Sequence, residues 1–516
     1  MGEMLYPIGI QEFDKLRAGG YVYVDKTMYI HELARTGCYY FLGRPRRFGK
    51  SLLISTMEAY FSGRRELFAG LAIERLTKEW TAYPVLHLDL NSGKYDNEAA
   101  LDEILNKMLN SWEKVYGKSD DEVTPGMRFY GIIQRAYEQT GKQVVILVDE
   151  YDKPLIQAIL DEKLQDNFRR TLKAFYSVLK TQDKYIKFAF LTGVTKFGKV
   201  SVFSDLNNLT DISMREKYAS ICGITEEEIH AYFEDSLREM ASANGMSYHD
   251  ALAKLKEQYD GYHFEVDTAG VFNPFSLLNA FSERKFRDYW FETGTPTFLV
   301  ELLQSCNYDL RRLQRGEIMA EDINKADSYE RNPIPMLYQS GYLTITGCDK
   351  EFGTYILDFP NKEVENGFIK FILPYYANDG SGNSKFTVTQ FVRDVRAGDP
   401  SGFMTRLQTF LENGDYRVAG DKEIYFQNVI FVIFRMMGLY TKVETVTARG
   451  RADILIETKD YIYIIECKLD GSADEALSQI EERGYAKPYA LDGRKLFKIG
   501  VNFSSESRGI GEWRVT

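Results

Sequence analysis

The chain has 516 residues, of which 44% are hydrophobic and 14% aromatic, enough to fill the cores of about two to four domains. Its formal net charge of −11 excludes attraction of nucleic acid by the molecule as a whole, so any such contact requires a local basic groove. The five cysteines are scattered without a C-x-x-C spacing, which argues against a disulfide framework or a zinc site.

Hydropathy predicts neither export nor a membrane span. No basic segment followed by an apolar one comes after Met1. The longest apolar stretch, 424–440, is interrupted by Gln427, Asn428 and Arg435, so it is a poor membrane helix. We therefore expect a cytoplasmic protein.

The first forty residues are expected to contain an extended segment, 21–24, and then a helix with Ile30 and Leu33 on one face. Asp25 and Thr27 stand where this helix begins. They either cap the helix or contact a nucleotide, and the sequence favours neither role.

A phosphate-binding loop is predicted at 41–53, where an apolar lead, a loop of glycine and arginine, and Gly-Lys-Ser open a helical pattern. In such a loop the N–H groups at the helix start hold phosphate, a solvent-facing Lys50 reaches the β and γ oxygens, and the Ser51 hydroxyl ligates Mg²⁺. The predicted nucleotide-binding residues are Gly43, Arg46, Arg47, Gly49, Lys50 and Ser51. The strict spacing requires glycine where the chain has Arg44, so the alternative is a chance Gly-Lys-Ser at a helix start.

Two further strands belong with this loop. Residues 84–90 complete a βαβ unit, in which His87 is more simply a core histidine than a ligand. The β-branched run 144–150 predicts a buried parallel strand that ends in two carboxylates beside the loop. Asp149 would hold Mg²⁺ and Glu150 would orient the attacking water, whereas the alternative is a solvated acidic turn.

Residues 185–193 predict another buried strand. Thr192, near its end, either has a role in the ATPase site or belongs to an ordinary turn. Lys196 follows in a loop that faces either nucleotide or solvent.

The middle of the chain, 224–303, is predicted to be mostly helical, with a capping box of Thr225 and Glu228 at its start. Two short strands are expected around 343–345 and 355–357. A polar segment, 377–384, then predicts an exposed loop within a helical connector.

A second chemical cluster is predicted near the C-terminus. Strand patterns at 450–457 and 461–468 flank a turn, and antiparallel pairing sets Asp453 opposite Glu466 at about 5 Å between Cβ atoms. Alternation places Lys468 on the face of Glu466. Two carboxylates and a phosphate oxygen suffice for Mg²⁺, and a lysine beside them can stabilise developing charge. The alternative is an edge hairpin with charged tips.

Together these stretches resemble the bacterial AAA-ATPase-like family, in which a P-loop ATPase is fused to a C-terminal PD-(D/E)XK nuclease-like domain. The resemblance spans nearly the whole chain and is carried by residues 23–27, 44–51, 148–152, 191–194 and 450–468. It implies that the Arg-Pro-Arg-Arg-Phe loop binds nucleotide despite its spacing, and that Thr192 occupies a sensor position. It also implies a nuclease site of Asp453, Glu466 and Lys468, which Gln479 and a further metal ligand, Glu423, would complete.

The implied fold is α/β: an N-terminal P-loop NTPase parallel sheet with a helical lid, and a C-terminal α/β nuclease-like domain. The expected domains are an ATPase core at 1–215, a helical lid or winged-helix-like segment at 216–345, a connector at 346–410 and the nuclease-like domain at 411–516. Arg215 and Arg238 are candidates for an arginine that the lid directs at ATP.

The expected function is ATP binding and hydrolysis coupled to a Mg²⁺-dependent DNA endonuclease. ATP and Mg²⁺ would be the cofactors, and DNA would bind through a local basic groove. No membrane partner is expected, and self-association is left open. The alternative is a nucleotide-dependent switch that binds a protein or nucleic acid with a catalytically silent nuclease-like domain.

Overall fold

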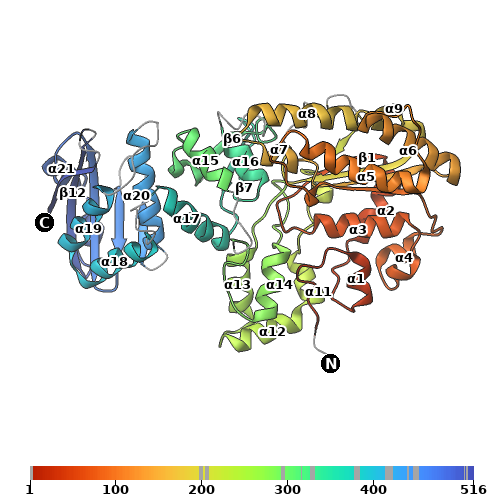
Figure 1. The fold of residues 1–516 in the computed structure, drawn as a ribbon. Helices are drawn as coiled ribbons and strands as arrows, with labels where there is room; N and C mark the ends of the chain where they lie inside the picture. The colour runs from red at the N-terminus through yellow and green to blue at the C-terminus, as the bar shows by residue number, and fades with distance from the viewer. Residues whose placement is uncertain are drawn as a thin grey trace. The chain divides into compact units, whose positions relative to one another are not determined.

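The computed structural model divides by internal contacts into two units, which are described separately (Figure 1). Unit 1 comprises Met1–Thr293 and Gly316–Glu363, and unit 2 comprises Gly294–Arg315 and Val364–Thr516. The residues described are 4–196, 202–203, 208–291, 297–314, 316–325, 332–376, 384–412, 422–438, 441–445, 453–504, 506 and 509–516. The domain boundaries expected at 215, 345 and 410 stay a prediction.

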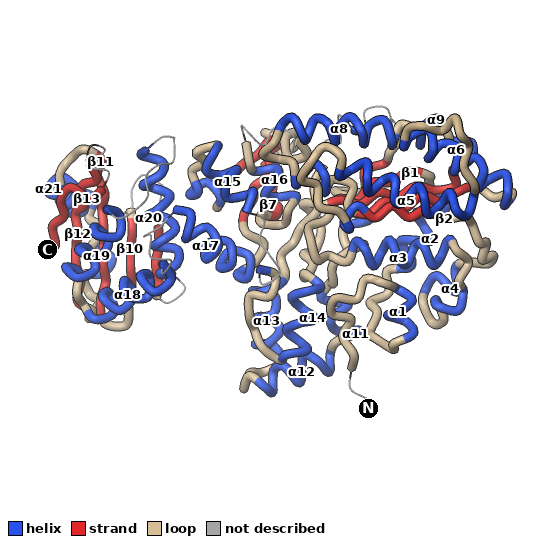
Figure 2. The backbone as a smooth tube through the Cα atoms, in the orientation of Figure 1, coloured by secondary structure: helices blue, strands red, loops and turns tan. Residues whose placement is uncertain are grey.

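Unit 1 is built on a parallel sheet with helices on both faces (Figure 2). Its strands are β1 (Tyr39–Gly43), β2 (Val85–Asp89), β3 (Val144–Asp149), β4 (Ile186–Gly193) and β5 (Thr210–Asp211), in the order β2-β3-β4-β1-β5. All six residues of β3 are buried, as its β-branched run predicts for a strand covered on both faces. The register pairs Gly43 with Gly193 and Val148 with Leu191, so the strand ends carrying the predicted site meet at one edge.

The helices of this unit include those predicted around Ile30, after the phosphate loop and from residue 224 onward. They are α1 (Phe13–Ala18), α2 (Thr27–Thr36), α3 (Lys50–Phe61), α4 (Ala72–Leu76), α5 (Ala100–Tyr116), α6 (Pro125–Thr140), α7 (Lys153–Gln157), α8 (Glu162–Tyr176), α9 (Val178–Thr181), α11 (Glu226–Tyr232), α12 (Glu234–Ala243), α13 (Tyr248–Tyr259), α14 (Pro274–Glu283) and α16 (Ile334–Gln339). The capping box of Thr225 and Glu228 is confirmed at the start of α11. Helices α11–α14 enclose a core that includes Phe233 and Leu237, and Val22 and Val24 pack against that core without joining a strand.

A small sheet in the order β6-β8-β7 completes unit 1. Its strands β7 (Thr344–Asp349) and β8 (Thr354–Asp358) confirm the two short strands predicted there. The third strand, β6 (Gly316–Met319), was not predicted, because four residues are too few to show an alternating pattern.

Unit 2 contains a mixed sheet in the order β13-β12-β11-β10-β9. Its strands are β9 (Lys442–Thr445), β10 (Ile454–Glu457), β11 (Tyr461–Leu469), β12 (Lys495–Ser504) and β13 (Gly509–Val515). Its helices are α15 (Thr297–Ser305), α17 (Lys362–Tyr376, which begins at the boundary), α18 (Ser384–Ala397), α19 (Pro400–Glu412), α20 (Lys422–Gly438) and α21 (Ala473–Arg483). The exposed loop predicted at 377–384 lies, except for its last residue, outside the described residues. Helix α21 connects the parallel strands β11 and β12, and Ile480 packs on Ile464.

The parallel sheet of unit 1 and the mixed sheet of unit 2 confirm the predicted α/β class. Across the described ranges, no helix is both long enough and apolar enough to cross a bilayer.

A buried carboxyl gives unit 1 a pH-dependent stability. Glu363 is 0% exposed, its Oε1 accepts a hydrogen bond from Trp290 N at 2.8 Å, and burial raises its pKa from 4.5 to about 8. Between these pH values the folded chain retains a proton that the unfolded chain has lost, so the free energy of unfolding should fall as the pH rises through this window. Glu363→Gln should flatten the fall, measured as urea unfolding midpoints against pH. The exposed Glu317→Gln is the control, and an equal slope in parent and Glu363→Gln would contradict the assignment.

Candidate functional site

The predicted phosphate loop joins the end of β1 to the start of α3. Gly49 precedes α3 with φ of 90°, a conformation that glycine adopts without strain. Lys50 was expected to face solvent, but it is only 5% exposed, and its Nζ donates to Arg44 O at 3.0 Å and Pro45 O at 3.1 Å. The loop therefore folds around the lysine ammonium, whose charge the two carbonyl oxygens stabilise. Ser51, the second residue of α3, is partly buried beside it.

Arg44, which replaces the glycine of the strict spacing, anchors the loop. Its guanidinium donates to Gly43 O at 2.9 Å, Ser213 O at 2.7 Å and Tyr218 O at 2.8 Å. It also lies 3.8 Å from the centre of the Phe264 ring, and burial lowers its pKa to about 10. Although Arg44 stands where the strict spacing requires glycine, its contacts with distant residues hold the loop in place.

Arg46 and Arg47 are the exposed cations of the loop. Arg47 has φ of 68°, and its guanidinium lies 4.5 Å from the centre of the Phe275 ring. Arg46 O accepts a hydrogen bond from Trp290 Nε1 at 3.4 Å. Burial, together with the charge of Arg46, lowers the pKa of Arg47. Trp290 therefore holds the loop backbone at Arg46, and Phe275 contacts the Arg47 guanidinium, while both arginines remain exposed.

The acidic end of β3 is held by the neighbouring strand β4. Asp149 is 4% exposed, and its Oδ1 accepts from Thr192 Oγ1 at 2.6 Å. Thr192 Oγ1 also accepts from Glu150 N at 3.4 Å, and Glu150 has φ of 52°. The structure thus brings Asp149, Glu150 and Thr192 together at the edge of the sheet where the phosphate loop begins.

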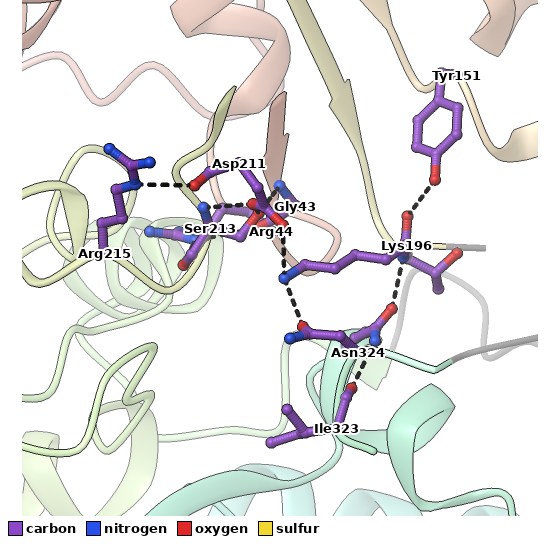
Figure 3. A network of polar contacts seen from close by, with 11 residues as sticks. Gly43, Arg44, Tyr151, Lys196, Asp211, Ser213, Arg215, Ile323 and Asn324 are labelled. Carbon is purple, nitrogen blue, oxygen red and sulfur yellow. Dashed lines mark hydrogen bonds and ion pairs between the residues drawn. The ribbon is translucent and has the colours of Figure 1, made fainter. Parts of the chain in front are cut away.

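A buried polar network links the end of β4 to the phosphate loop (Figure 3). Lys196 Nζ lies 2.9 Å from Asp211 Oδ2 and donates to Asn324 Oδ1 at 2.5 Å. Asp211 Oδ1 accepts from Ser213 Oγ at 2.6 Å, and that hydroxyl accepts from Gly43 N at 2.8 Å. The Lys196 side chain is therefore buried and does not face solvent. The Asp211 carboxylate compensates the cost of burying its charge.

Asp152 and the two candidate arginines, Arg215 and Arg238, also have structural partners. Asp152 is 1% exposed and accepts from Val194 N and Thr195 N, and burial raises its pKa to about 6. Arg215 Nε donates to Asp211 O at 3.1 Å, and Arg238 pairs with Glu234 on the same helix. Each of these side chains is therefore already engaged in this structure.

An apolar cavity of about 100 Å³ opens beside the loop. Several separate stretches of the chain line it, among them those of Val24 and Lys26, of Gly49 and Leu52, of Ile221, and of Leu278. Lys26 Nζ pairs with Glu228 Oε1 at 2.5 Å in its wall. The cavity was not predicted, because its lining comes from several distant stretches of chain. The adjacent Asp25 accepts from Thr27 N and Ala72 N, so it caps backbone groups.

The second predicted cluster lies in unit 2, where β10 and β11 pair antiparallel as predicted. Ile456 pairs with Tyr463 and Ile454 with Ile465, which confirms the predicted register. Asp453 N donates to Glu466 Oε2 at 3.3 Å, and Cys467 N donates to Asp453 Oδ2 at 2.9 Å. The two carboxylates therefore lie side by side at the start of β10 and near the end of β11.

Gln479 of α21 joins this pair to Lys468. Its Nε2 donates to Glu466 Oε1, while its Oε1 accepts from Lys468 Nζ, which lies 3.9 Å from the same Glu466 oxygen. Burial, and then the nearby Asp453, raise the pKa of Glu466 to about 7. Burial also raises the pKa of Asp453, opposed by the Cys467 N–H and by the positive charges of Lys468 and Arg311. A buried Glu466 and a partly buried Asp453 repel each other, which provides a strong electrostatic preference for a cation.

The donor set fits a hard divalent ion. Two carboxylates are enough for Mg²⁺, which takes oxygen ligands and retains several waters. Within the part of the chain that the structure describes, no group of three or more His, Cys, Asp or Glu side chains is arranged to bind a metal. Glu423 lies in the first turn of α20, but its side chain is outside the described part.

Comparison with known proteins assigns a family to the region that contains each cluster. Residues 7–203 match the family model of predicted AAA-ATPases, and residues 421–513 match that of the PD-(D/E)XK nuclease superfamily. An "uncharacterized protein in vnfD 5'region" of Azotobacter chroococcum mcd 1 is 34% identical over 523 residues, covering 99% of this chain and 98% of the relative. The Aeropyrum pernix ORC2 structure is 10% identical with a TM-score of 0.24, over 67% of this chain and 88% of that one, too weak a likeness to support an argument. The chain therefore belongs to the AAA-ATPase-like family and carries a C-terminal domain of the PD-(D/E)XK nuclease superfamily.

Proposed function

We propose that unit 1 binds and hydrolyses ATP and that unit 2 cleaves DNA with Mg²⁺. The observation that carries the first half is the hydrogen bond from Thr192 to Asp149 at the sheet edge where Lys50 is enclosed by its loop. Nucleotide phosphates would take the place of the Arg44 and Pro45 carbonyls as partners of the lysine. The apolar cavity beside Gly49 offers a planar base a place to bind.

Each predicted residue has a role in this proposal. Ser51 and Asp149 would hold Mg²⁺, which neutralises charge on the phosphates when bound. Thr192 fixes the orientation of the Asp149 carboxylate, and Glu150 would orient the attacking water. Contacts to phosphate oxygens would come from Gly43, Arg46, Arg47, Gly49 and Lys50. Calorimetric titration with ATP and Mg²⁺ tests this half of the proposal.

Glu150→Gln should keep ATP binding but slow phosphate release roughly a hundredfold, because the amide fits the site but cannot accept a proton or hold the water as strongly. Turnover is measured as phosphate release, and affinity by calorimetry. The exposed Glu138→Gln is the control. Unchanged turnover in Glu150→Gln would exclude this residue, and Asp152 could not readily replace it, because its carboxylate already accepts from Val194 N and Thr195 N.

In unit 2, Asp453 and Glu466 would bind Mg²⁺, and Lys468 would stabilise charge on the phosphate under attack. The observation supporting this is the convergence of the three side chains around Gln479. Glu423 stays a proposed further ligand. Titration with Mg²⁺ or Mn²⁺, followed by melting temperature, tests metal binding independently of cleavage.

A nucleotide-dependent switch with a silent nuclease-like domain is the second candidate. The net charge of −11 favours it, because the molecule as a whole repels DNA. It predicts ATP binding by the parent without cleavage of any DNA form.

A further inference from the structure

The Asp211 carboxylate joins two parts of the candidate ATPase site, one with each of its oxygens (Figure 3). Its Oδ1 accepts from the backbone N and from the Oγ of Ser213, at 2.9 and 2.6 Å. Because the single hydroxyl proton of Ser213 is donated to Asp211, Ser213 Oγ is left as an acceptor, and Gly43 N donates to it at 2.8 Å. Asp211 Oδ1 therefore fixes the residue at which β1 passes into the phosphate loop.

Gly43 is suited to this contact. A Cβ atom at this position would lie 3.3 Å from Ser213 Oγ, closer than most Cβ contacts in proteins, so glycine lets the hydroxyl approach the backbone. Arg44 Nη1 adds a hydrogen bond to Ser213 O at 2.7 Å. Because β5 has only two residues, these bonds and not a long strand pairing hold Ser213 beside the loop.

The other oxygen of Asp211 holds the chain just beyond β4. Lys196 is 5% exposed there, and its Nζ lies 2.9 Å from Asp211 Oδ2. Gln339 of α16 fixes the same residue, because its Oε1 accepts from Lys196 N at 2.6 Å. Strand β4 also carries Thr192, which donates to Asp149. One carboxylate thus connects the strand end that orients Asp149 to the loop that would hold phosphate.

A buried ion pair is weak evidence for stability, because the cost of desolvating two charges offsets much of their attraction. The placement of this pair between two parts of one site indicates a role in geometry. We propose that Lys196 and Asp211 are positioning residues of the ATPase. They set the distance between the phosphate loop and the end of β4, and so align the phosphate with the water that Glu150 would orient. This inference rests on the proposed ATPase function.

The test is ATP hydrolysis by the full chain, with kcat and KM determined separately and ATP affinity measured by calorimetry. Lys196→Met with Asp211→Asn removes both charges, so neither is left buried alone, and the asparagine retains an oxygen for Ser213. We expect kcat to fall roughly tenfold to a hundredfold, because a misplacement of about 1 Å can cost that much. ATP affinity should change far less, since every residue that would contact phosphate is kept. The calorimetric stoichiometry corrects kcat for any unfolded fraction.

Arg128→Met with Glu113→Gln is the matched control, because it also neutralises a buried ion pair of unit 1. Arg128 Nε donates to Glu113 Oε1 at 2.6 Å between α6 and α5, and both side chains are 8% exposed. This variant should keep the kcat of the parent even if its melting temperature shifts.

Three results would overturn the inference while the ATPase proposal stands. The Lys196→Met, Asp211→Asn variant could keep the kcat of the parent, lose no more kcat than the control, or lose ATP affinity as much as kcat. If the parent does not hydrolyse ATP, both the inference and the ATPase proposal fail.

Discussion

Lys50→Ala is expected to weaken ATP binding at least about a hundredfold, because the lysine contributes charge-assisted bonds to phosphate that no neighbour replaces. The structure adds a smaller effect. Since Lys50 Nζ donates to Arg44 O and Pro45 O, the variant should also lose a little stability without nucleotide, about 1 kcal/mol per lost bond. Calorimetry with ATP and Mg²⁺ measures the first effect, and the melting temperature of the protein alone measures the second.

Lys142→Ala is the matched control for this variant. Lys142 Nζ also donates to a backbone carbonyl, Ala82 O at 3.1 Å, but it precedes β3 and so lies at the opposite edge of the sheet. Its loss should leave ATP affinity unchanged. Equal affinity in the parent and Lys50→Ala would mean that the loop is only the start of a helix.

Lys468→Ala should reduce DNA cleavage about a hundredfold to a thousandfold, the loss seen when one donor to developing charge is removed. Metal binding should persist, with affinity unchanged or slightly higher, since a positive charge beside the site is gone. Asp453→Asn and Glu466→Gln should instead weaken metal binding. Asp453→Asn should not destabilise the protein without metal, because it relieves repulsion and retains an oxygen that can accept the Cys467 N–H.

The affinity for metal should also depend on pH. Because the pKa of Glu466 is about 7, the carboxylate must lose a proton to bind metal, so the metal affinity should rise as the pH rises to about 7 and level off above it.

The control for Lys468→Ala is Lys498→Ala. Lys498 lies on β12 of the same sheet and pairs with Glu481 of α21. Identical metal affinity in the parent, Asp453→Asn and Glu466→Gln would make the hairpin purely structural.

Local patterns were sufficient to predict the parts of both sites that lie within single elements. The β-branched run of β3 predicts a buried strand, and the two-residue period of a hairpin sets Asp453 opposite Glu466 without further information. The same reasoning places Lys50 at a helix start but predicts an exposed side chain. The carbonyl oxygens that accept its hydrogen bonds come close only when the loop folds back, which the local pattern does not show.

Contacts between distant segments could not be predicted this way. Lys196 gave no signal of burial, since its partners Asp211 and Asn324 are far along the chain. The wall of the cavity beside Gly49 comes from several distant segments, and nothing in the sequence indicates that Tyr308 and Asn428 are hydrogen-bonded. Such long-range pairing is fixed by tertiary packing, which periodicity and short motifs do not encode.

Cleavage of supercoiled plasmid by the full chain, with Mg²⁺ and with or without ATP, tests the central claim most directly. We expect the parent to cut the plasmid, with a rate that ATP alters and that EDTA abolishes, and we expect cutting to be lost in Lys468→Ala. The response to ATP should be absent in Lys50→Ala. Cutting by Lys468→Ala at the rate of the parent, or no cutting by the parent under any of these conditions, would contradict it.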